Sequence, residues 1–165
     1  MKFRNLTLAL ACICFAFSSL AQTSDAEAEA IVQLLGVQKK EAIAKLVSVT
    51  GKDSVAFWKI YEEYHQKNLA TAKVRIKLYE QTARAYGNMT PATADSLSVA
   101  YFSNRFNQEK SLEEYYKKIK TATNAVIAFE FYQAEVYILT QIRAQIMQQI
   151  PTYGQFQAAV KKQRE

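Results

Sequence analysis

The longest regular pattern in the chain is a run of mostly apolar positions at spacings of three and four that begins just after Gly51. This spacing places the whole run on one face of an α-helix. Thr50 stands at the N-cap position, and Gly87-Asn88 is a stop signal. The pattern therefore predicts one helix over residues 52–86, about 50 Å long. Its face consists of Trp58, Tyr61, His65, Leu69, Ala72, Ile76, Tyr79, Ala83 and Tyr86.

Two further stretches of the same period follow, and Thr123-Asn124 separates them. Thr90 is suited to cap the first, with Pro91 as its first helical residue. Pro151 ends the second. We expect helices over 91–121 and 123–149. The apolar faces are Leu97, Tyr101, Phe102, Phe106, Leu112, Tyr115, Tyr116 and Ile119, then Val126, Ile127, Phe131, Ala134, Ile138, Ile142 and Ile146.

The last of these helices carries only Glu130 and Glu135 as charges between Thr121 and Gln141. A helix this apolar normally lies in the middle of a bundle. A membrane span over 125–142 is the alternative interpretation, but two glutamates would cost several kcal/mol in hydrocarbon. The sequence therefore favours a buried helix.

The N-terminal part of the chain predicts a weaker helix. Ser24 and Glu27 form a capping-box pattern, and an apolar face follows. Gly36 interrupts this face and predicts a division into two pieces. The segment 39–48 is the surer of the two, and it gives the bundle a short helix.

Glycine and proline are scarce, with four and two residues in a chain of 165. An all-β protein needs a turn residue every few positions, so the fold class is all-α: long antiparallel helices in a helical hairpin or four-helix-bundle arrangement. The predicted organisation is a cleaved signal peptide at 1–21, a single helical domain at 22–151 and a flexible basic tail at 152–165.

The first residues resemble a secretory leader. Lys2 and Arg4 precede an apolar run that is too short for a membrane span, and Ala21 is a small residue before a possible cut. Cleavage after Ala21 would remove both cysteines, so the exported, periplasmic chain would contain no disulfide. A retained N-terminal anchor and a lipoprotein cut before Cys12 are the alternatives.

Catalytic or metal chemistry needs clustered donors, and the chain has one histidine, His65. A di-metal bundle needs Glu-x-x-His on two helices, which a single histidine cannot supply, and the Cys-x-x-Cys-His of a covalent haem is absent from the sequence. A haem between His65 and Met89 or Met147 is a weaker interpretation than a structural histidine at the helix seam. The sequence therefore predicts a protein that is not an enzyme and needs no cofactor, metal or catalytic residue.

Two groups in the predicted helix 52–86 are candidate contacts for a polypeptide. The aromatic residues at 57–64 are too crowded for one narrow seam, so part of the group could face a partner although a core role is the commoner one. The basic residues at 67–84 could bind acidic, partly unfolded chains or an anionic membrane surface, with nucleic acid disfavoured; a solvated face is their ordinary interpretation. The candidate set is Phe57, Trp58, Tyr61, Tyr64, Lys73, Lys77, Tyr79, Arg84 and Tyr86.

Two short segments, Asp53-Ser54-Val55 and Asp95-Ser96-Leu97, are similar to the O-glycosylation acceptor of some exported bacterial proteins. Each segment also falls in the early turns of a predicted helix, where Asp and Ser are common. Both interpretations stay open.

Several segments in order resemble the Spy/CpxP-like exported helical proteins of bacteria. They are Lys39-Lys40-Glu41-Ala42-Ile43-Ala44, Val49-Thr50-x-x-Asp53, the segment from Phe57 to Tyr64, Met89-Thr90-Pro91, Tyr115-Tyr116-Lys117-Lys118, the segment from Phe131 to Glu135, and Gln149-Ile150-Pro151. The family repeats Leu-Thr-x-x-Gln, whereas this chain has Val49 and Asp53 in the first copy and Met89 and Thr93 in the second. The chain resembles a divergent branch of the family.

The resemblance implies an envelope protein that acts as an ATP-independent chaperone or a stress-signalling accessory, often as a cradle-shaped dimer. We expect a holdase for partly unfolded chains. A regulatory or scaffold protein that docks one dedicated envelope partner is the alternative. We also expect a non-covalent homodimer, because the face from Trp58 to Tyr86 is longer than the shorter elements can cover.

Overall fold

The structure of the chain is a computed structural model that describes residues 25–164. This part contains α-helices, one short 3-10 helix and no strand, so the predicted all-α class is confirmed. The elements are α2 (Asp25–Leu46), α3 (Gly51–Ala85), η2 (Tyr86–Asn88), α4 (Pro91–Ala122), α5 (Ala125–Gln149) and α6 (Tyr153–Lys162). The predicted signal peptide lies outside the described residues.

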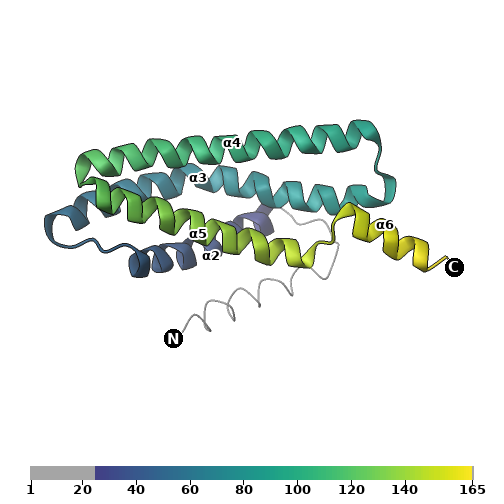
Figure 1. The fold of residues 1–165 in the computed structure, drawn as a ribbon, viewed down its shortest axis with the longest axis horizontal. Coiled ribbons are helices and arrows are strands. Elements are labelled where there is room, and N and C mark those ends of the chain that lie inside the picture. Colours follow the sequence, from purple (N-terminus) through teal and green to yellow (C-terminus); the bar gives the residue numbers. More distant parts are fainter. Residues whose placement is uncertain (1–24, 165) are drawn as a thin grey trace.

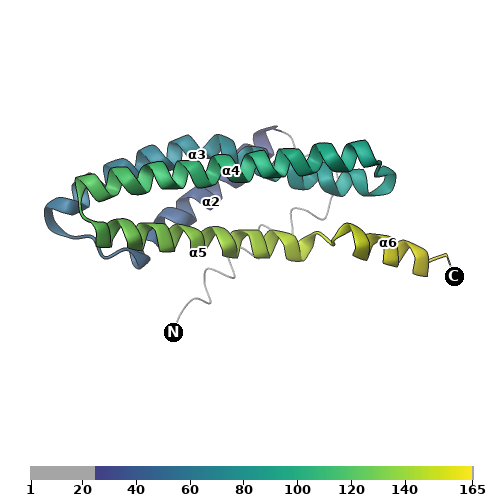
Figure 2. The ribbon, with the colours of Figure 1, turned by 45° about the horizontal axis from the view of Figure 1, so that its top comes forward.

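The long helices α3, α4 and α5 run side by side and alternate in direction (Figure 1). Helix α2 packs against both α3 and α5, which closes a ring of four helices at one end of the bundle. Figure 2 shows α6 continuing beyond the end of α5 towards the C-terminus. At the end of the bundle near α6, the short α2 no longer accompanies the other three.

Side-chain capping explains where two of the three long helices begin. Thr90 accepts a hydrogen bond from the Thr93 amide at 3.1 Å, and Pro91 follows it. Asn124 accepts from the amides of Val126 at 2.9 Å and Ile127 at 3.1 Å, so the break before α5 is confirmed. Thr50 stands before α3, but its side chain makes no capping bond. The turn there depends on Gly51, whose φ of 60° lies in the left-handed region that favours glycine.

Gly36 does not divide the N-terminal helix, because α2 is continuous from Asp25 to Leu46. The predicted division is wrong, and the reason is a close contact between helices. A Cβ atom at residue 36 would lie 2.4 Å from Cε1 of His65 on α3. Gly36 therefore leaves room for the His65 ring against α2 and does not end the helix.

The segment after Pro151 forms a helix, where the sequence predicted a flexible tail. Thr152 and Gln155 make a reciprocal capping box, which fixes the first turn of α6. Tyr153 and Phe156 then place their rings against Tyr86, with centroids 5.5 and 5.4 Å from it. The sequence analysis overlooked this capping pair.

The hydrophobic core fills the end of the bundle where four helices meet. Phe131 of α5 lies at its centre, with zero exposure and ring contacts to Phe57, Tyr61 and Tyr64 of α3 at 5.3 to 6.3 Å. The buried cluster consists of Ile43, Val47, Phe57, Tyr61, Tyr64, Leu112, Tyr115, Ile119, Ile127, Ala128, Phe131, Ala134 and Ile138.

Helix α4 faces the bundle with the predicted side at Leu112, Tyr115 and Ile119, but the prediction fails over the first half of the helix. Phe102 and Phe106, expected on the inner face, are 72% and 67% exposed. Asn104, Gln108 and Ser111 are buried there and accept hydrogen bonds from neighbouring helices. Asn68 of α3 donates from Nδ2 to Ser111 Oγ at 2.9 Å, whereas Arg143 of α5 donates to Gln108. Helix α4 therefore has an inner side that is polar in part and an outer side that carries phenylalanines.

Within the described residues, no helix is long and apolar enough to cross a membrane. This agrees with the interpretation of α5 as a bundle helix. Its inner face carries the core residues Ile127, Phe131 and Ile138.

Replacing Phe131 with alanine should lower the free energy of unfolding by about 3–5 kcal/mol, because the truncation leaves a cavity among three other rings. Urea unfolding followed by circular dichroism measures this change. The matched control is Phe102→Ala, which removes the same ring from an exposed position and should change stability by less than about 0.5 kcal/mol. Equal losses in the two variants would contradict this description of the core.

Candidate functional site

The aromatic members of the predicted binding set lie mainly in the core. Phe57, Tyr61 and Tyr64 have zero exposure, so they cannot contact a client while the bundle is folded. For these three, the surface interpretation is wrong and the core interpretation holds. Trp58 lies at the edge of the core, half-buried, with its ring edge-on to Phe57 at 5.0 Å.

The remaining members of the set are spread along the second half of α3. Tyr79 packs its ring against Tyr101 of α4 at 5.8 Å. Tyr86 donates a hydrogen bond from its hydroxyl to the Pro151 carbonyl at 2.7 Å. Both rings are thus engaged within the chain, although they remain half-exposed.

The basic members share one face of α3. Lys73, Lys77 and Arg84 are separated by four and seven residues, which places them on one side of a helix. Arg84 is paired with Glu80, and Lys73 and Lys77 are half-buried. The structure therefore does not bring the nine candidates together into one surface, and a binding role for the basic face stays a prediction.

A buried charged cluster joins α2, α3 and α5, and the sequence analysis did not predict it. Glu135 has zero exposure, and its Oε2 atom accepts from Lys39 Nζ at 2.8 Å and from the Tyr64 hydroxyl at 2.8 Å. The Lys39 side chain is 11% exposed, and its ammonium also lies 4.9 Å from the Tyr64 ring centroid. One carboxylate oxygen thus holds three helices together.

Burial raises the pKa of Tyr64 well above its usual value, and the Glu135 carboxylate raises it further. The Tyr64 hydroxyl therefore keeps its proton and can donate to Glu135. Burial also raises the pKa of Tyr61, whose hydroxyl lies in the same region without a hydrogen-bond partner. Because Glu135 is fully enclosed, its carboxylate contacts protein side chains from α2 and α3 rather than solvent.

A sequence signal for this cluster existed. Glu135 follows Phe131 by four residues and precedes Ile138 by three, so it falls on the buried face of α5. A charge at such a position needs a partner with the opposite charge. The partner, Lys39, lies on a helix whose position relative to α5 only the tertiary structure fixes.

His65 faces α2 beside Gly36 and lies near Lys39 and Lys40 of that helix. Burial lowers its pKa, and the charges of Lys39 and Lys40 lower it further, while Glu62 and Glu135 act in the opposite direction. The described residues contain no group of three or more His, Cys, Asp or Glu side chains that could hold a metal ion.

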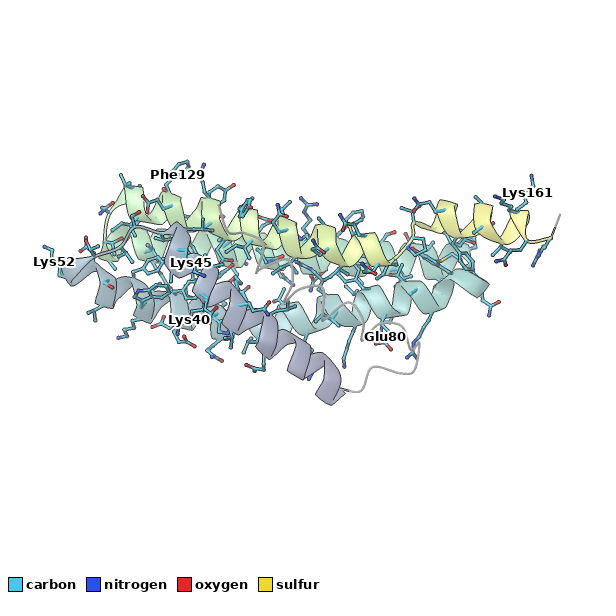
Figure 3. All side chains as sticks on the ribbon, turned by 90° about the horizontal axis from the view of Figure 1, so that it is seen from below. Lys40, Lys45, Lys52, Glu80, Phe129 and Lys161 are labelled. Atoms are coloured by element: carbon cyan, nitrogen blue, oxygen red, sulfur yellow. The ribbon has the colours of Figure 1, made fainter. Side chains whose placement is uncertain are left out.

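The most exposed apolar surface lies on the opposite side of the bundle from α2, between α4 and α5. A groove of about 710 Å³ runs there, lined by Phe106, Glu109, Lys110, Leu112, Glu113, Tyr116, Phe129 and Tyr132. Phe106, Phe129 and Tyr132 are 67%, 50% and 42% exposed. Figure 3 shows Phe129 on the outer side of α5, pointing away from α2. We call these residues the α4–α5 groove.

Comparison of the chain with models of known protein families, with curated proteins and with solved structures finds no match. The likeness to the Spy/CpxP-like proteins therefore remains an expectation from the sequence segments alone. The functional argument depends on the geometry of this chain.

Replacing Lys39 with methionine should lower the free energy of unfolding by about 3–5 kcal/mol, because it leaves the Glu135 carboxylate buried without its positive partner. Urea unfolding measures the loss, and adding Glu135→Gln should restore part of it. The matched control is Lys40→Met, whose partner Glu62 is 43% exposed; it should cost less than about 1 kcal/mol. A similar loss in both lysine variants would exclude the special role of Glu135.

Stability should also fall as the pH drops from about 7 to about 5. The folded state binds a proton at His65 more weakly than the unfolded chain, whose histidine pKa is about 6.5. Acid therefore favours unfolding in this pH range, and the contribution of the neutral His65 to stability is complete only above this range. Urea unfolding at several pH values measures the slope of the free energy of unfolding against pH. Because His65 is the only histidine, His65→Asn should flatten the slope between these limits, and an unchanged slope would contradict the assignment.

Proposed function

We propose that this chain is an exported binding protein that holds partly unfolded polypeptides without ATP, using the α4–α5 groove as its contact surface. The observation that carries the proposal is the exposure of Phe106, Phe129 and Tyr132 around one open groove. Aromatic side chains in such numbers on the outside of a bundle lower its solubility unless they serve an interaction.

The apolar surface continues beyond the groove itself. Val126 and Val136 on α5 are 66% and 38% exposed, and Val99 and Phe102 on α4 are 59% and 72% exposed. Spacings of three and four residues put each set on the outer side of its helix. The resulting surface is long enough to contact an extended or helical segment of another chain.

The charges at the rim of the groove favour broad rather than selective binding. Glu109, Lys110 and Glu113 alternate in sign over one turn of α4. A rim of mixed charge neither attracts nor repels one class of peptide strongly, whereas selective interfaces use repulsion against wrong partners. Aromatic rings supply contact area that does not depend on the client's sequence.

The basic face of α3, formed by Lys73, Lys77 and Arg84, is a second contact in this proposal. It would attract acidic segments of a client or an anionic membrane surface. The proposed envelope location depends on the leader-like residues at 1–21 and on the resemblance to exported helical proteins.

A dedicated partner is the alternative occupant of the groove, and a second copy of the chain is a special case of it. The reasoning that led to a homodimer assumed an open face on α3. In the structure, Tyr61 and Ile76 of that face are buried, and Tyr86 is packed against Phe156. A homodimer remains a proposal, and its interface would now be the α4–α5 groove.

Replacing Phe106 and Phe129 together with serine should remove most of the protein's ability to prevent aggregation. The expected reason is the loss of exposed aromatic area in the groove. Light scattering of reduced, denatured lysozyme and of one unrelated client, diluted without ATP into stoichiometric amounts of the protein, measures the effect.

The matched control is Val55→Ser with Val74→Ser, since these valines of α3 are 77% and 49% exposed but lie outside the groove. The triple variant Lys73→Ala, Lys77→Ala, Arg84→Ala tests the basic face separately. A wild-type protein that prevents no aggregation would refute the holdase function. A groove variant equal to wild type would refute only the location.

Crosslinking in the native envelope separates the two candidate functions. A holdase should yield many weak partners, whereas a docking protein should yield one partner at fixed stoichiometry. Light scattering of the purified chain tests self-association: a mass of one chain throughout the micromolar range would exclude the homodimer.

A further inference from the structure

Near the N-terminal end of α2, the interior of the bundle contains buried polar side chains. Asn104 and Gln108 of α4 point inward and are 6% exposed each. Arg75 of α3 donates to the Asn104 side-chain oxygen from Nε at 2.9 Å and from Nη2 at 2.8 Å. Arg143 of α5 donates from Nη2 to the Gln108 oxygen at 2.8 Å. The two amides therefore hold guanidinium groups from two different helices in fixed positions.

These two arginines and Arg105 of α4 line one pocket of about 470 Å³. Aromatic rings form much of its remaining wall, and Tyr79 and Tyr101 lie against each other there. None of the residues that line the pocket is an aspartate or a glutamate. We call this site the arginine–tyrosine pocket; the residues that define it are Arg75, Tyr79, Tyr86, Tyr101, Arg105 and Arg143.

Each guanidinium keeps donors beyond those that the amides use. A guanidinium carries five N–H donors in a planar fork that matches two oxygens of a carboxylate or phosphate. Arg143 directs one hydrogen bond to Gln108. Arg105 is exposed at the surface of the same pocket. The pocket can thus offer several charge-assisted hydrogen bonds to one anion.

The structure shows three positive side chains close together in this pocket, with Glu109 the one carboxylate that raises the pKa of Arg75 among the described side chains. Among the side chains that the structure describes, no carboxylate forms an ion pair with Arg75, Arg105 or Arg143. Burial lowers the pKa of Arg75, and the charges of Arg143 and Arg105 lower it further. The three guanidinium groups therefore repel one another, and a bound anion would relieve this repulsion.

The C-terminal corner closes one end of the pocket. Pro151 and Tyr153 line it at the junction of α5 and α6, and Tyr86 fixes this corner by its hydrogen bond to the Pro151 carbonyl. Helix α6 continues outward from there to Lys161, which Figure 3 labels. The volume lies within the range of small-molecule sites in proteins, about 300–1,000 Å³.

We propose that the arginine–tyrosine pocket binds a small organic anion whose carboxylate or phosphate meets the three arginines and whose aromatic or apolar body lies against the tyrosine rings. The anionic group gives the orientation, and the rings give contact area. This site is separate from the α4–α5 groove, and its ligand is not a client polypeptide. It would give the protein a small-molecule ligand in addition to its proposed partner.

Isothermal titration calorimetry with four probes tests the site: 2-naphthoate, 2-naphthyl phosphate, inorganic phosphate and the neutral 2-naphthalenemethanol. We expect at least one naphthyl anion to bind at least tenfold more tightly than both the neutral alcohol and inorganic phosphate. The preferred anion then identifies a carboxylate or a phosphate as the natural head group. Failure of both naphthyl anions to bind, or equal affinity for the neutral alcohol or for inorganic phosphate, would overturn the proposal.

Variants locate the binding. Arg105→Gln alters an exposed side chain, so it should leave the fold intact and lower the affinity for the preferred anion at least fivefold. Adding Arg143→Gln should lower this affinity at least twentyfold. The charge-matched control is Lys52→Gln with Lys59→Gln, exposed lysines of α3 outside the pocket, and it should bind as wild type does.

The groove variant Phe106→Ser with Phe129→Ser should also keep full affinity, which separates this site from the proposed holdase surface. Unchanged affinity in Arg105→Gln, or equal losses in the lysine control, would show that the anion binds elsewhere and would overturn the assignment.

Discussion

The unequal lengths of α2 and α3 shape the whole molecule. Helix α2 has 22 residues and α3 has 35, and Gly36 of α2 lies against His65 of α3. An antiparallel helix with this register that begins at residue 25 reaches no further than about residue 76 of α3. One end of the bundle therefore has four helices around an aromatic core. The other end has three, and its interior is only partly closed.

The two ends place charge inside the protein in different ways. At the four-helix end, the Glu135 carboxylate is enclosed but compensated by Lys39 and by the Tyr64 hydroxyl. This arrangement fixes where α2 sits, because a single missing partner would leave a buried charge. Nearer to α6, Arg75 and Arg143 donate to the neutral amides of Asn104 and Gln108, and no carboxylate among the described side chains forms an ion pair with either arginine. The first arrangement pairs its charge within the chain although Glu135 Oε1 has no hydrogen-bond partner, and the second presents positive charge to a pocket.

Helix α4 takes part in both features, because its inner side packs inside the bundle and its outer side carries exposed phenylalanines. Its inner side changes from apolar residues near Ile119 to the polar residues Gln108 and Asn104, following the change from four helices to three. Its outer side carries Phe102 and Phe106, which contribute nothing to the core. A sequence pattern of apolar residues cannot distinguish a core stripe from an exposed one, since both repeat at three and four residues. That ambiguity explains why Phe102 and Phe106 were predicted to face inward, although the prediction holds for Leu112, Tyr115 and Ile119.

The sequence by itself determined the all-α class, the break between α4 and α5 at Asn124 and the capped start of α4 at Thr90, because capping and helical periodicity are local properties. It also carried the capping box of α6, formed by Thr152 and Gln155. Only the tertiary structure decided that Gly36 is a contact point, that Phe57, Tyr61 and Tyr64 are core, that Glu135 meets Lys39, and that three arginines from three helices share one pocket. The physical reason is that burial and charge pairing depend on the rotation and register of one helix against another. Side chains from distant segments set these quantities together, and no local pattern records them.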